Sequence, residues 1–478
     1  MRNIKQNKFL KRIEDLRQDK LGITIRKISI IDIEIFLLYI PQLTDRERLS
    51  SDIIKPILQF GKNEKLDIDT MVSSILYLDD ICIDDEEDSI TEYILKGNTV
   101  ILTSNDDKYI IANTFKVEKR SVEPPDIQTA IRAPRDSFTE NLNTNLSLIR
   151  YRIKDSALRI DYCSVGRRTK TTTAVIYIDD IANPRTVSEI KNRLKDIKID
   201  GIVESGYIQK FILNNPLNLF PQVSIAERSD TACASILNGK ICVIVEGSNL
   251  ALILPTTFFE FLDTGDDHYD NLYLAVFTKF IRITAIIITL NLSALYVAVV
   301  SFHPDILPPQ YILALATSRV TVPVNALLEA TLMEFVSELL REASIRLPKQ
   351  IGPAIGIVGT IVIGQAAVAA GLVSPLMVII VSLSTMASFA APDYTITTPI
   401  RILKFMMIFI TGVFGLFGFI MGFTIIVINI VSATSFGVPY FSPVAPLNVK
   451  DLKNYILSDI TLAKIRPRFL KTKDKTKQ

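Results

Sequence analysis

The sequence predicts an α/β head of two soluble subdomains followed by a polytopic α-helical membrane domain. Hydrophobic residues make up 48% of the 478 residues although 22% are charged, so the two kinds must be separated along the chain. Residues 1–271 hold 36 basic and 42 acidic side chains, residues 272–449 hold 8 and 6, and residues 450–478 hold 9 and 3. The chain therefore has an acidic head, a nearly uncharged body and a basic tail.

Five segments follow from this distribution. We expect residues 1–29 to form an N-terminal extension, 30–150 and 151–271 two cytoplasmic α/β subdomains, 272–449 a transmembrane domain of four to six helices, and 450–478 a basic cytoplasmic tail. The first of these segments is rich in charged side chains and lacks an apolar core of signal-peptide length. The head is therefore expected to stay on the side of the membrane where it is made.

The first subdomain alternates short apolar runs with amphipathic stretches. Residues 33–40 predict a strand, residues 89–95 predict a helix that ends at Gly97, and residues 98–103 and 109–112 predict a strand hairpin. A further helical pattern follows Thr44 and places on one face Leu49, Ile53, Ile54, Ile57 and Leu58.

The second subdomain repeats this mixture of elements. Residues 173–178, 199–203, 241–245 and 250–254 predict strands, and residues 187–194 predict a helix. The last two strands are separated by a short polar segment that contains glycine, as in a hairpin turn.

Residues that carry enzymatic chemistry are sparse. The two histidines are His268 and His303, and the four cysteines, which lack metal-site spacing, are Cys82, Cys163, Cys233 and Cys242. The acidic run 84–88 lacks the glycine and the spacing of a calcium loop, which favours a solvated loop. No glycine-rich phosphate loop occurs, and no basic face accompanies the aromatic residues. We therefore expect no enzyme activity, no cofactor, no metal and no nucleic-acid partner.

Long uncharged runs begin after residue 272. Residues 283–302 form an uncharged stretch of 20 residues, which at about 1.5 Å per residue matches the roughly 30 Å of a bilayer core. Residues 353–391 are also uncharged, and the break Gly371-Leu-Val-Ser-Pro375 near their middle predicts a helical hairpin. Residues 405–433 are either one long span or two short ones.

Basic residues near the span ends predict the orientation. Lys279 and Arg282 precede the first span, and the tail is basic, so both the head and the tail should be cytoplasmic. The number of crossings is then even, four or six. The cations between residues 341 and 349 conflict with this scheme unless the segment 308–340 itself returns through the membrane.

Residues 325–346 predict an amphipathic helix with a row of carboxylates. Its apolar face carries Leu328, Leu332, Phe335, Val336 and Leu339. Glu334, Glu338 and Glu342 recur every fourth residue on the other side. In a membrane, exposing each charge to lipid would cost roughly 2.5–3.5 kcal/mol, so the acids would face water or partners, as in a pore wall. The alternative is a surface helix whose acids pair with Arg341 and Arg346 at the interface.

Small residues spaced by four follow this helix, and they are Gly352, Gly356, Thr360 and Gly364. Such spacing lets helices approach closely in lipid. Gln365 is the strongly polar side chain of the same span, and it must form a hydrogen bond with another helix or with water. Helix packing and ion contact both remain possible roles for this span, and they are compatible at an oligomer axis.

Longer blocks resemble a known family. The blocks in the head are Arg120-Ser-Val-Glu-Pro124, Phe138-Thr-Glu-Asn-Leu142, Leu148-Ile-Arg150 and Leu219-Phe-Pro-Gln222 with Glu227-Arg228 and Asp230. The blocks in the body are Leu295-Tyr-Val-Ala298, Leu340-Arg-Glu-Ala-Ser-Ile-Arg-Leu-Pro348, Ile363-Gly-Gln-Ala-Ala-Val368, Gly371-Leu-Val-Ser-Pro375 and Ser435-Phe-Gly-Val-Pro-Tyr440. Over residues 30–448 the chain resembles the A subunit of the GerA-type spore germinant receptors.

The resemblance implies a subunit of the spore inner membrane whose head faces the spore core. It implies assembly with a transporter-like B subunit and a lipoprotein C subunit, and self-association into a homo-oligomeric, pentameric cation channel that opens when a nutrient binds. On this hypothesis the candidate ion pathway comprises Glu334, Glu338, Val362 and Gln365. The alternative is a non-conducting scaffold that relays the signal, and a secondary transporter is weaker because the body shows no internal repeat.

Overall fold

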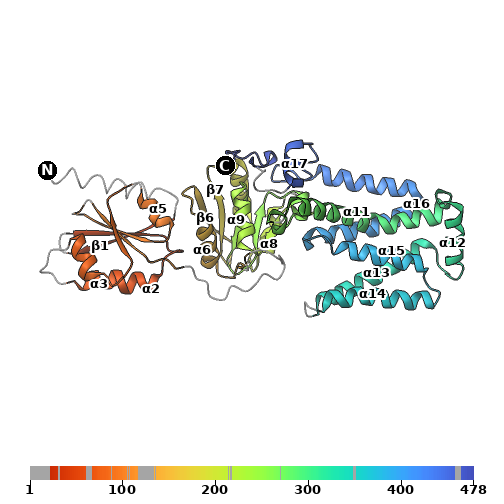
Figure 1. Cartoon of the computed structure of the whole chain (residues 1–478), viewed down its shortest axis with the longest axis horizontal. Helices are drawn as coiled ribbons and strands as arrows, with labels where there is room; N and C mark the ends of the chain where they lie inside the picture. The colour runs from red at the N-terminus through yellow and green to blue at the C-terminus, as the bar shows by residue number, and fades with distance from the viewer. Residues whose placement is uncertain are drawn as a thin grey trace.

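The computed structural model describes residues 22–30, 33–60, 67–87, 89–104, 106, 108–116, 134, 136–213, 215, 218–269, 271–347, 351–457 and 464–477. The molecule is elongated, with the two sheets of the head and the helical region following one another along its length (Figure 1). The C-terminal end of the chain returns to the second sheet (Figure 1). The α/β head predicted from the sequence is therefore present, and it precedes a helical region.

The first subdomain is built on a five-stranded antiparallel sheet. The strands, in spatial order, are β1 (Thr24–Ile30), β2 (Ile33–Tyr39), β4 (Thr99–Thr103), β5 (Tyr109–Ala112) and β3 (Ile81–Asp84). The structure confirms the strand at 33–40 and the hairpin of 98–103 with 109–112. It adds β1, all but the last residue of which lies in the range 1–29 that the sequence treats as an extension, and β3, which ends at the start of the acidic run.

Helices cover both faces of this sheet and create two cores. One face packs against η1 (Leu49–Ile54), α3 (Lys55–Gln59), α4 (Ile68–Thr70) and η2 (Met71–Ile75). The short α2 (Arg46–Arg48), whose residues are exposed, leads into η1. The other face packs against α5 (Ser89–Leu95), after which Gly97 adopts a φ of 91°. The predicted helix after Thr44 is present, but Leu58 points outward and is exposed. Leu58 lies in α3 one residue after the buried Ile57, which turns its side chain about 100° around the helix and away from the core.

The second subdomain is built on another antiparallel sheet. Its strands, in spatial order, are β6 (Leu158–Val165), β7 (Thr171–Ile178), β9 (Ile241–Val245), β10 (Ala251–Leu254) and β8 (Ser224–Ala226). One face packs against α6 (Leu142–Arg152) and α9 (Ser229–Leu237), and the other against α7 (Pro184–Asp196) and α8 (Ser205–Ile212). Because α6 belongs to this core, the second subdomain includes residues before the expected boundary at 151.

One strand prediction in this subdomain is wrong. Residues 199–203 form a loop, in which the carbonyl of Ile199 accepts a hydrogen bond from the amide of Arg167 and that of Ile202 accepts one from the Thr171 hydroxyl. The turn after β6 thus satisfies the backbone groups that a neighbouring strand would otherwise use.

The helical region contains six long segments that run back and forth. They belong to α11 (Leu272–Phe302), α13 (Ala326–Ile345), α14 (Gly352–Ala369), α15 (Pro375–Ser388) and the two halves of α16 (Tyr394–Ser432), with η4 (Pro304–Ile306) and α12 (Pro309–Arg319) at the end far from the head. By length and composition, α11 and α16 could each cross a membrane, and parts of α14 and α15 are shorter apolar helices. The predicted hairpin with its break at 371–375 is confirmed.

The segment 405–433 forms two antiparallel helices, because α16 reverses at Gly415. This glycine has φ 62° and ψ −144°, a conformation outside the helical range. A Cβ built on Gly418 would lie 2.4 Å from the carbonyl oxygen of Ile410, and one on Gly422 would lie 2.8 Å from the sulfur of Met407. In a continuous helix those partners would be more than 10 Å apart, at about 1.5 Å per residue.

The end of α16 is inserted into the head. A short hairpin of β11 (Thr434–Ser435) and β12 (Val438–Pro439) follows the helix. The Ser435 hydroxyl donates to the carbonyl of Gln222 (2.7 Å) and accepts from the amide of Thr256 (3.2 Å). Phe436 is buried in the core of the second subdomain. This motif therefore joins the helical region to the second sheet.

Candidate functional site: an ion cluster inside the helical region

Helix α13 places its apolar face outward and its acidic face inward. The exposed fractions of Leu328, Leu332 and Phe335 are 56% each, whereas Glu334 is fully buried. Asn325 begins the helix by accepting a hydrogen bond from the amide of Leu328 (2.9 Å), so the predicted start is confirmed. An amphipathic helix on a water-soluble protein has the opposite arrangement.

The carboxylate of Glu334 binds groups from two other helices. Ser293 of α11 donates its hydroxyl to Oε1 (2.5 Å), and the ammonium of Lys404, in the first half of α16, lies 2.6 Å from Oε2. Only 2% of the Lys404 side chain is exposed. The pair is thus removed from solvent, and its mutual attraction offsets the cost of burying two charges.

Glu338 lies one turn further along α13 and continues the cluster toward the head. Arg401 donates to its Oε2 (2.9 Å), Lys404 Nζ lies 3.6 Å from Oε1, and Arg341 Nε lies 3.8 Å from Oε2. Arg341 also donates to the hydroxyl of Ser388 at the end of α15. The cluster of two acids and three cations therefore connects α13, α15 and α16 and carries one net positive charge.

Glu329 occupies the other end of α13. Its Oε1 accepts hydrogen bonds from the amide and the hydroxyl of Ser374, both 2.6 Å, at the start of α15. Arg319 of α12 lies 3.5 Å from its Oε2. Gly371 has a φ of 70° and Pro375 begins α15, so the tight turn between α14 and α15 is fixed to α13 through this buried carboxylate.

The third acid of the predicted row lies outside the cluster. Glu342 pairs with Arg346 (2.7 Å) one turn later, and both side chains are exposed. The row of acids therefore divides in two: Glu334 and Glu338 pair mainly with cations of another helix, and Glu342 pairs within its own helix.

The small residues of α14, which begins at Gly352, contact neighbouring helices of the same chain. A Cβ on Gly356 would lie 3.5 Å from the hydroxyl of Ser344, and one on Gly364 would lie 2.6 Å from a methyl group of Val378. Thr360 is buried beside them and donates its hydroxyl to the carbonyl of Gly356 (2.8 Å). These positions allow α13 and α15 to pack closely against α14.

The opposite side of α14 has no neighbour among the residues that the structure describes. Val362 is 55% exposed, and Gln365 is exposed on the same side one turn later. Figure 1 shows α14 at the margin of the helical region. The structure thus separates the four residues of the predicted pathway into an internal pair, Glu334 and Glu338, and an outward pair on α14.

Residues that sequence reasoning missed supply the other half of the cluster. They come from three helices and are Lys404, Arg401, Ser293 and Arg319. The first three are 41–70 residues from the acids that they contact, and Arg319 is 10 residues from Glu329. A signal was present: Arg401 and Lys404 are one turn apart at the start of an otherwise apolar run. Such cations require a buried anionic partner.

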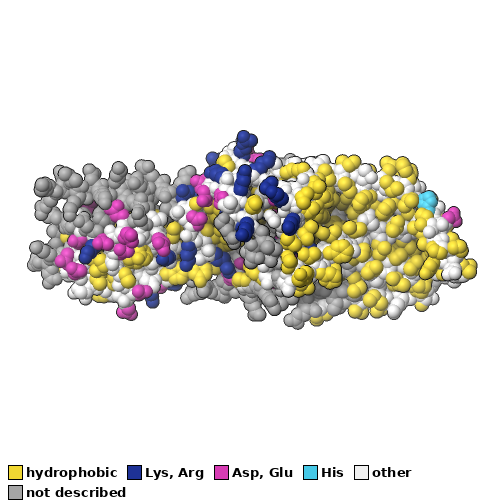
Figure 2. All heavy atoms as spheres, turned by 45° about the horizontal axis from the view of Figure 1, so that its top comes forward, with side chains coloured by type: hydrophobic (Ala, Val, Ile, Leu, Met, Phe, Trp, Pro, Cys, Tyr) yellow, Lys and Arg dark blue, Asp and Glu magenta, His cyan; other side chains and the backbone are white. Residues whose placement is uncertain are grey.

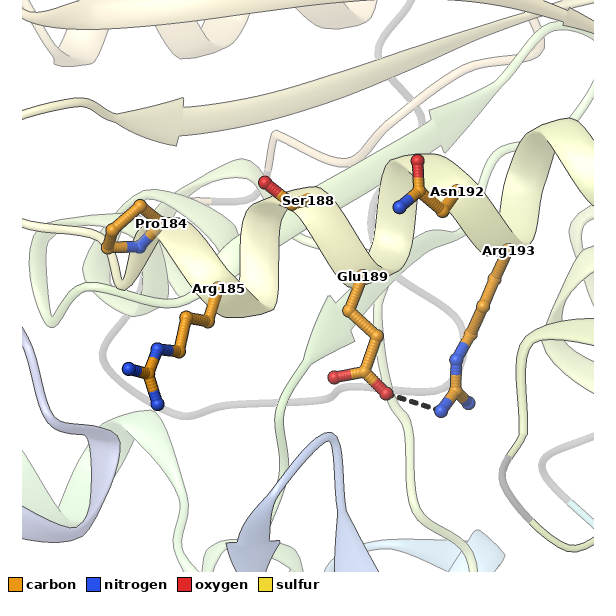
Figure 3. A pocket seen from close by; sticks show the side chains of 6 residues that line it. All are labelled: Pro184, Arg185, Ser188, Glu189, Asn192 and Arg193. Atoms are coloured by element: carbon orange, nitrogen blue, oxygen red, sulfur yellow. Dashed lines mark hydrogen bonds and ion pairs between the residues drawn. The ribbon is translucent and has the colours of Figure 1, made fainter.

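The head contains a surface hollow of about 650 Å³ along α7, lined by Pro184, Arg185, Ser188, Glu189, Asn192 and Arg193. Figure 3 shows Arg185, Glu189 and Arg193 extending from the same side of this helix. Arg193 pairs with Glu189, donates to the carbonyl of Ile212 and stacks 4.8 Å from the ring centre of Phe436. These contacts fix the hairpin that follows α16 and indicate a structural junction.

A polar network joins α6 and α9, which cover one face of the second sheet. Arg152 donates to both oxygens of Asp136 (2.7 Å each), and Ser229 donates to Oδ2 (2.6 Å). Burial would raise the pKa of Asp136, but these hydrogen bonds and the charge of Arg152 outweigh it and hold the pKa below its usual value.

Burial raises the pKa of the Cys233 thiol to about 12, so this thiol is an inert core group.

Together, the fold and the cluster define a class of protein: a two-part α/β head joined to an apolar helical region with ion pairs in its interior. The chain belongs to the Bacillus/Clostridium GerA spore germination protein family, whose profile matches residues 9–469. The resemblance stated from the sequence is therefore confirmed.

Three relatives illustrate the match. GerLA of Bacillus cereus, a spore germination protein, is 37% identical over 96% of this chain and 95% of its own length. Spore germination protein KA of Bacillus subtilis is 35% identical over 95% of this chain and 85% of its own length. YfkQ, an uncharacterised membrane protein of Bacillus subtilis, is 34% identical over 88% of this chain and 82% of its own length. A crystal structure of the N-terminal domain of the A subunit of the Bacillus megaterium spore germinant receptor GerK3 aligns with a TM-score of 0.40 and 24% identity, covering 52% of this chain and 94% of that one.

Proposed function

We propose that the chain is the A subunit of a nutrient germinant receptor and triggers spore germination as part of a nutrient-gated cation channel in the spore inner membrane. Copies of the chain would surround a common axis, five in the arrangement that the family resemblance implies. A transporter-like B subunit would bind the nutrient, and a lipoprotein C subunit would complete the receptor. Family membership across residues 9–469 supports this role.

The observation that carries the membrane placement is the orientation of α13. Leu328, Leu332, Phe335 and Leu339 are each 55–56% exposed. Three of the four carboxylates of the same helix, those of Glu329, Glu334 and Glu338, are paired inside the protein. Lipid favours this arrangement, since apolar side chains are soluble in it whereas charges must find partners in the interior. Water would favour the reverse.

The distribution of cations supports a head on the cytoplasmic or core side. Because α13 returns toward the head, Arg341 and Arg346 lie at the same end of the helical region as Arg282 and Arg401. If the six antiparallel segments all cross the membrane, the number of crossings is even, and Arg341 and Arg346 lie on the same side as the head. Basic residues gathered at one end favour retention of that end in the cytoplasm.

The ion pathway that we propose follows the free side of α14. Val362 and Gln365 lie on that side, where a ring of copies would bring them to a common axis. Glu334 and Glu338 would attract cations only after separating from Lys404 and Arg401, so their pairs would favour the closed state. Nutrient binding by a partner would then shift the population toward an open state for which the liganded partner has higher affinity.

One observation favours the alternative of a non-conducting scaffold. Both acids of the predicted pathway are neutralised by cations of the same chain, and they offer no free negative charge in this conformation. A scaffold would use the same pairs only to hold the helices at fixed positions while the head relays the signal.

Cysteine labelling separates the two functions. Val362→Cys and Gln365→Cys would be introduced with Cys82→Ser, which removes the exposed native thiol. A cationic thiol reagent should then slow nutrient-triggered potassium release from proteoliposomes that hold the complete receptor, and oxidation should cross-link neighbouring copies through residue 362. The matched control is Leu332→Cys on the apolar side of α13, which would face lipid and should therefore neither react with the charged reagent nor change potassium release.

Unchanged potassium release after complete labelling at both α14 positions would remove this helix from the pathway. A receptor that triggers germination in spores but conducts nothing in liposomes would support the scaffold.

A further inference from the structure

The short helix α17 (Val449–Leu457) has an unusual exposed surface. Val449 is 67% exposed and Ile456 is 41% exposed, and the exposed side chains between them are Lys450 and Lys453. Leu447, two residues before the helix, is also 67% exposed. Apolar and cationic groups therefore project together from one helix. This combination is typical of helices that lie in the interface of a membrane.

Contacts fix α17 at the junction of the head and the helical region. The Lys279 ammonium, in the second turn of α11, donates to the carbonyl of Tyr455 (2.7 Å). The ring of Tyr455 contacts that of Phe259, with 5.4 Å between centres. The exposed residues of α17 thus lie where the long apolar α11 begins, the level at which a bilayer around that helix would have its headgroups.

The segment that follows adds fixed positive charge to this surface. Its exposed basic side chains are Lys464, Arg468, Lys471, Lys473, Lys475 and Lys477, of which Lys473 lies 3.7 Å from a carboxylate oxygen of Asp179 in the head. The described acids of the tail are engaged: Asp451 accepts hydrogen bonds from the amide of Arg468 and the side chain of Asn448, both 2.9 Å, and Asp474 pairs with Arg466. Figure 2 shows dark blue side chains gathered beside the end of the yellow surface of the helical region.

The same segment is held on the second subdomain. The amide of Lys473 donates to the carbonyl of Ile181, and Arg466 Nε donates to the carbonyl of Leu237, both 2.9 Å. These contacts keep the cations close to the junction, so their positions relative to a bilayer are set by the fold.

We propose that α17 and the basic segment 464–477 bind the anionic headgroups of membrane phospholipids on the head side of the bilayer, with Leu447, Val449 and Ile456 inserted between the headgroups. This proposal rests on the proposed function in one respect: the helical region must lie in a membrane. A lipid surface fits better than a nucleic acid because the patch mixes apolar with cationic groups and continues the apolar surface of the helices. Each cation close to an anionic surface strengthens binding about five-fold.

The test uses the full-length protein in nanodiscs. An environment-sensitive fluorophore is attached at Val449→Cys in the Cys82→Ser background, and the nanodiscs contain phosphatidylcholine with increasing fractions of phosphatidylglycerol. We expect a blue shift that grows with phosphatidylglycerol, quenching by lipids spin-labelled near the headgroup, and reversal at high salt. Lys450→Gln with Lys453→Gln should raise the phosphatidylglycerol fraction at half-maximal shift at least five-fold, whereas arginine at both positions should preserve it.

Two labelled controls make a negative result informative. A fluorophore at Phe335→Cys on α13 should be quenched by lipids spin-labelled in the acyl chain, and one at Leu58→Cys in the first subdomain should not be quenched by either lipid. Quenching at 335 without any lipid effect at 449 would overturn this proposal alone. Absence of quenching at 335 would instead contradict the membrane placement on which the proposed function depends.

A protein partner would give a different result. If the fluorophore at residue 449 shifts only when the other receptor subunits are added, and shifts equally in discs without phosphatidylglycerol, the surface binds protein and the lipid proposal is wrong.

The control for the loss of two lysines at 450 and 453 is the replacement of Lys198 and Lys210, two exposed lysines of the head, by glutamine. It removes the same charge and should leave the lipid response unchanged.

Discussion

Replacing Lys404 with methionine should destabilise the helical region, because it leaves the Glu334 carboxylate buried without a cation. The Lys404 ammonium lies 2.6 Å from Glu334, and the two side chains are 2% and 0% exposed. Removing one partner of such a pair costs about 3–5 kcal/mol. Of the contacts described above, only the hydroxyl of Ser293 would remain on that carboxylate.

The reverse substitution should cost less. Glu334→Gln leaves Lys404 with Glu338 at 3.6 Å, and the amide can still accept the hydrogen bond from Ser293, so we expect a loss of about 1–3 kcal/mol. The double variant removes both charges and should recover most of the stability lost in Lys404→Met. The coupling energy between the two positions should therefore be about 2 kcal/mol or more.

The assay is reversible unfolding of the purified full-length protein in mixed detergent micelles, with a double-mutant cycle over the four variants. The matched control is the pair Glu342 and Arg346, which has nearly the same separation, 2.7 Å, but is exposed. Removing that pair should change stability by about 0–1 kcal/mol. Additive effects of Lys404→Met and Glu334→Gln would refute the reasoning, since they would mean that the two charges do not interact in the folded protein.

Three further predictions concern packing, backbone geometry and the head. Gly364→Val should destabilise the helical region by about 1–3 kcal/mol in the same unfolding assay, because even a Cβ at this position lies 2.6 Å from Val378. Gly415→Ala should cost about 1–3 kcal/mol, since φ 62° with ψ −144° is suited to glycine and the added methyl group would lie 2.9 Å from the ring of Phe302. Asp136→Asn should weaken the head by about 1–3 kcal/mol at pH 7, measured as faster hydrogen exchange in α6 and α9 of the full-length protein.

Two of these predictions, at Gly364 and at Asp136, have an internal check. Gly356→Ala adds a methyl group at an ordinary 3.5 Å from Ser344, so it should be nearly neutral; equal losses at 356 and 364 would contradict the packing argument. The pKa of Asp136 is lowered in the folded state, so its contribution is full above the unfolded pKa of about 3.9 and is lost as pH falls through the folded pKa. The difference between Asp136→Asn and the parent should hold from pH 5 to 8 and shrink below about pH 4.

The predicted strands show where local patterns suffice. The runs 33–40, 98–103, 109–112, 173–178 and 241–245 all form strands, because apolar β-branched residues fit a buried sheet in almost any arrangement. The run 199–203 has similar residues but forms a loop, since its backbone groups pair with the turn after β6. Which hydrogen-bond partners a segment finds depends on the tertiary structure and not on its local sequence.

The sequence alone determined the division into an acidic head, an apolar body and a basic tail, the break between α14 and α15, and the helical period that aligns Glu334 with Glu338. These features depend on composition and on residues within a few turns of one another. The tertiary structure decided that Glu334 and Glu338 turn inward, because that choice depends on Lys404 and Arg401, more than 60 residues away. It also decided the reversal at Gly415, since a flexible residue permits a turn, whereas the contacts of Gly418 with Ile410 and of Gly422 with Met407 make the turn stable.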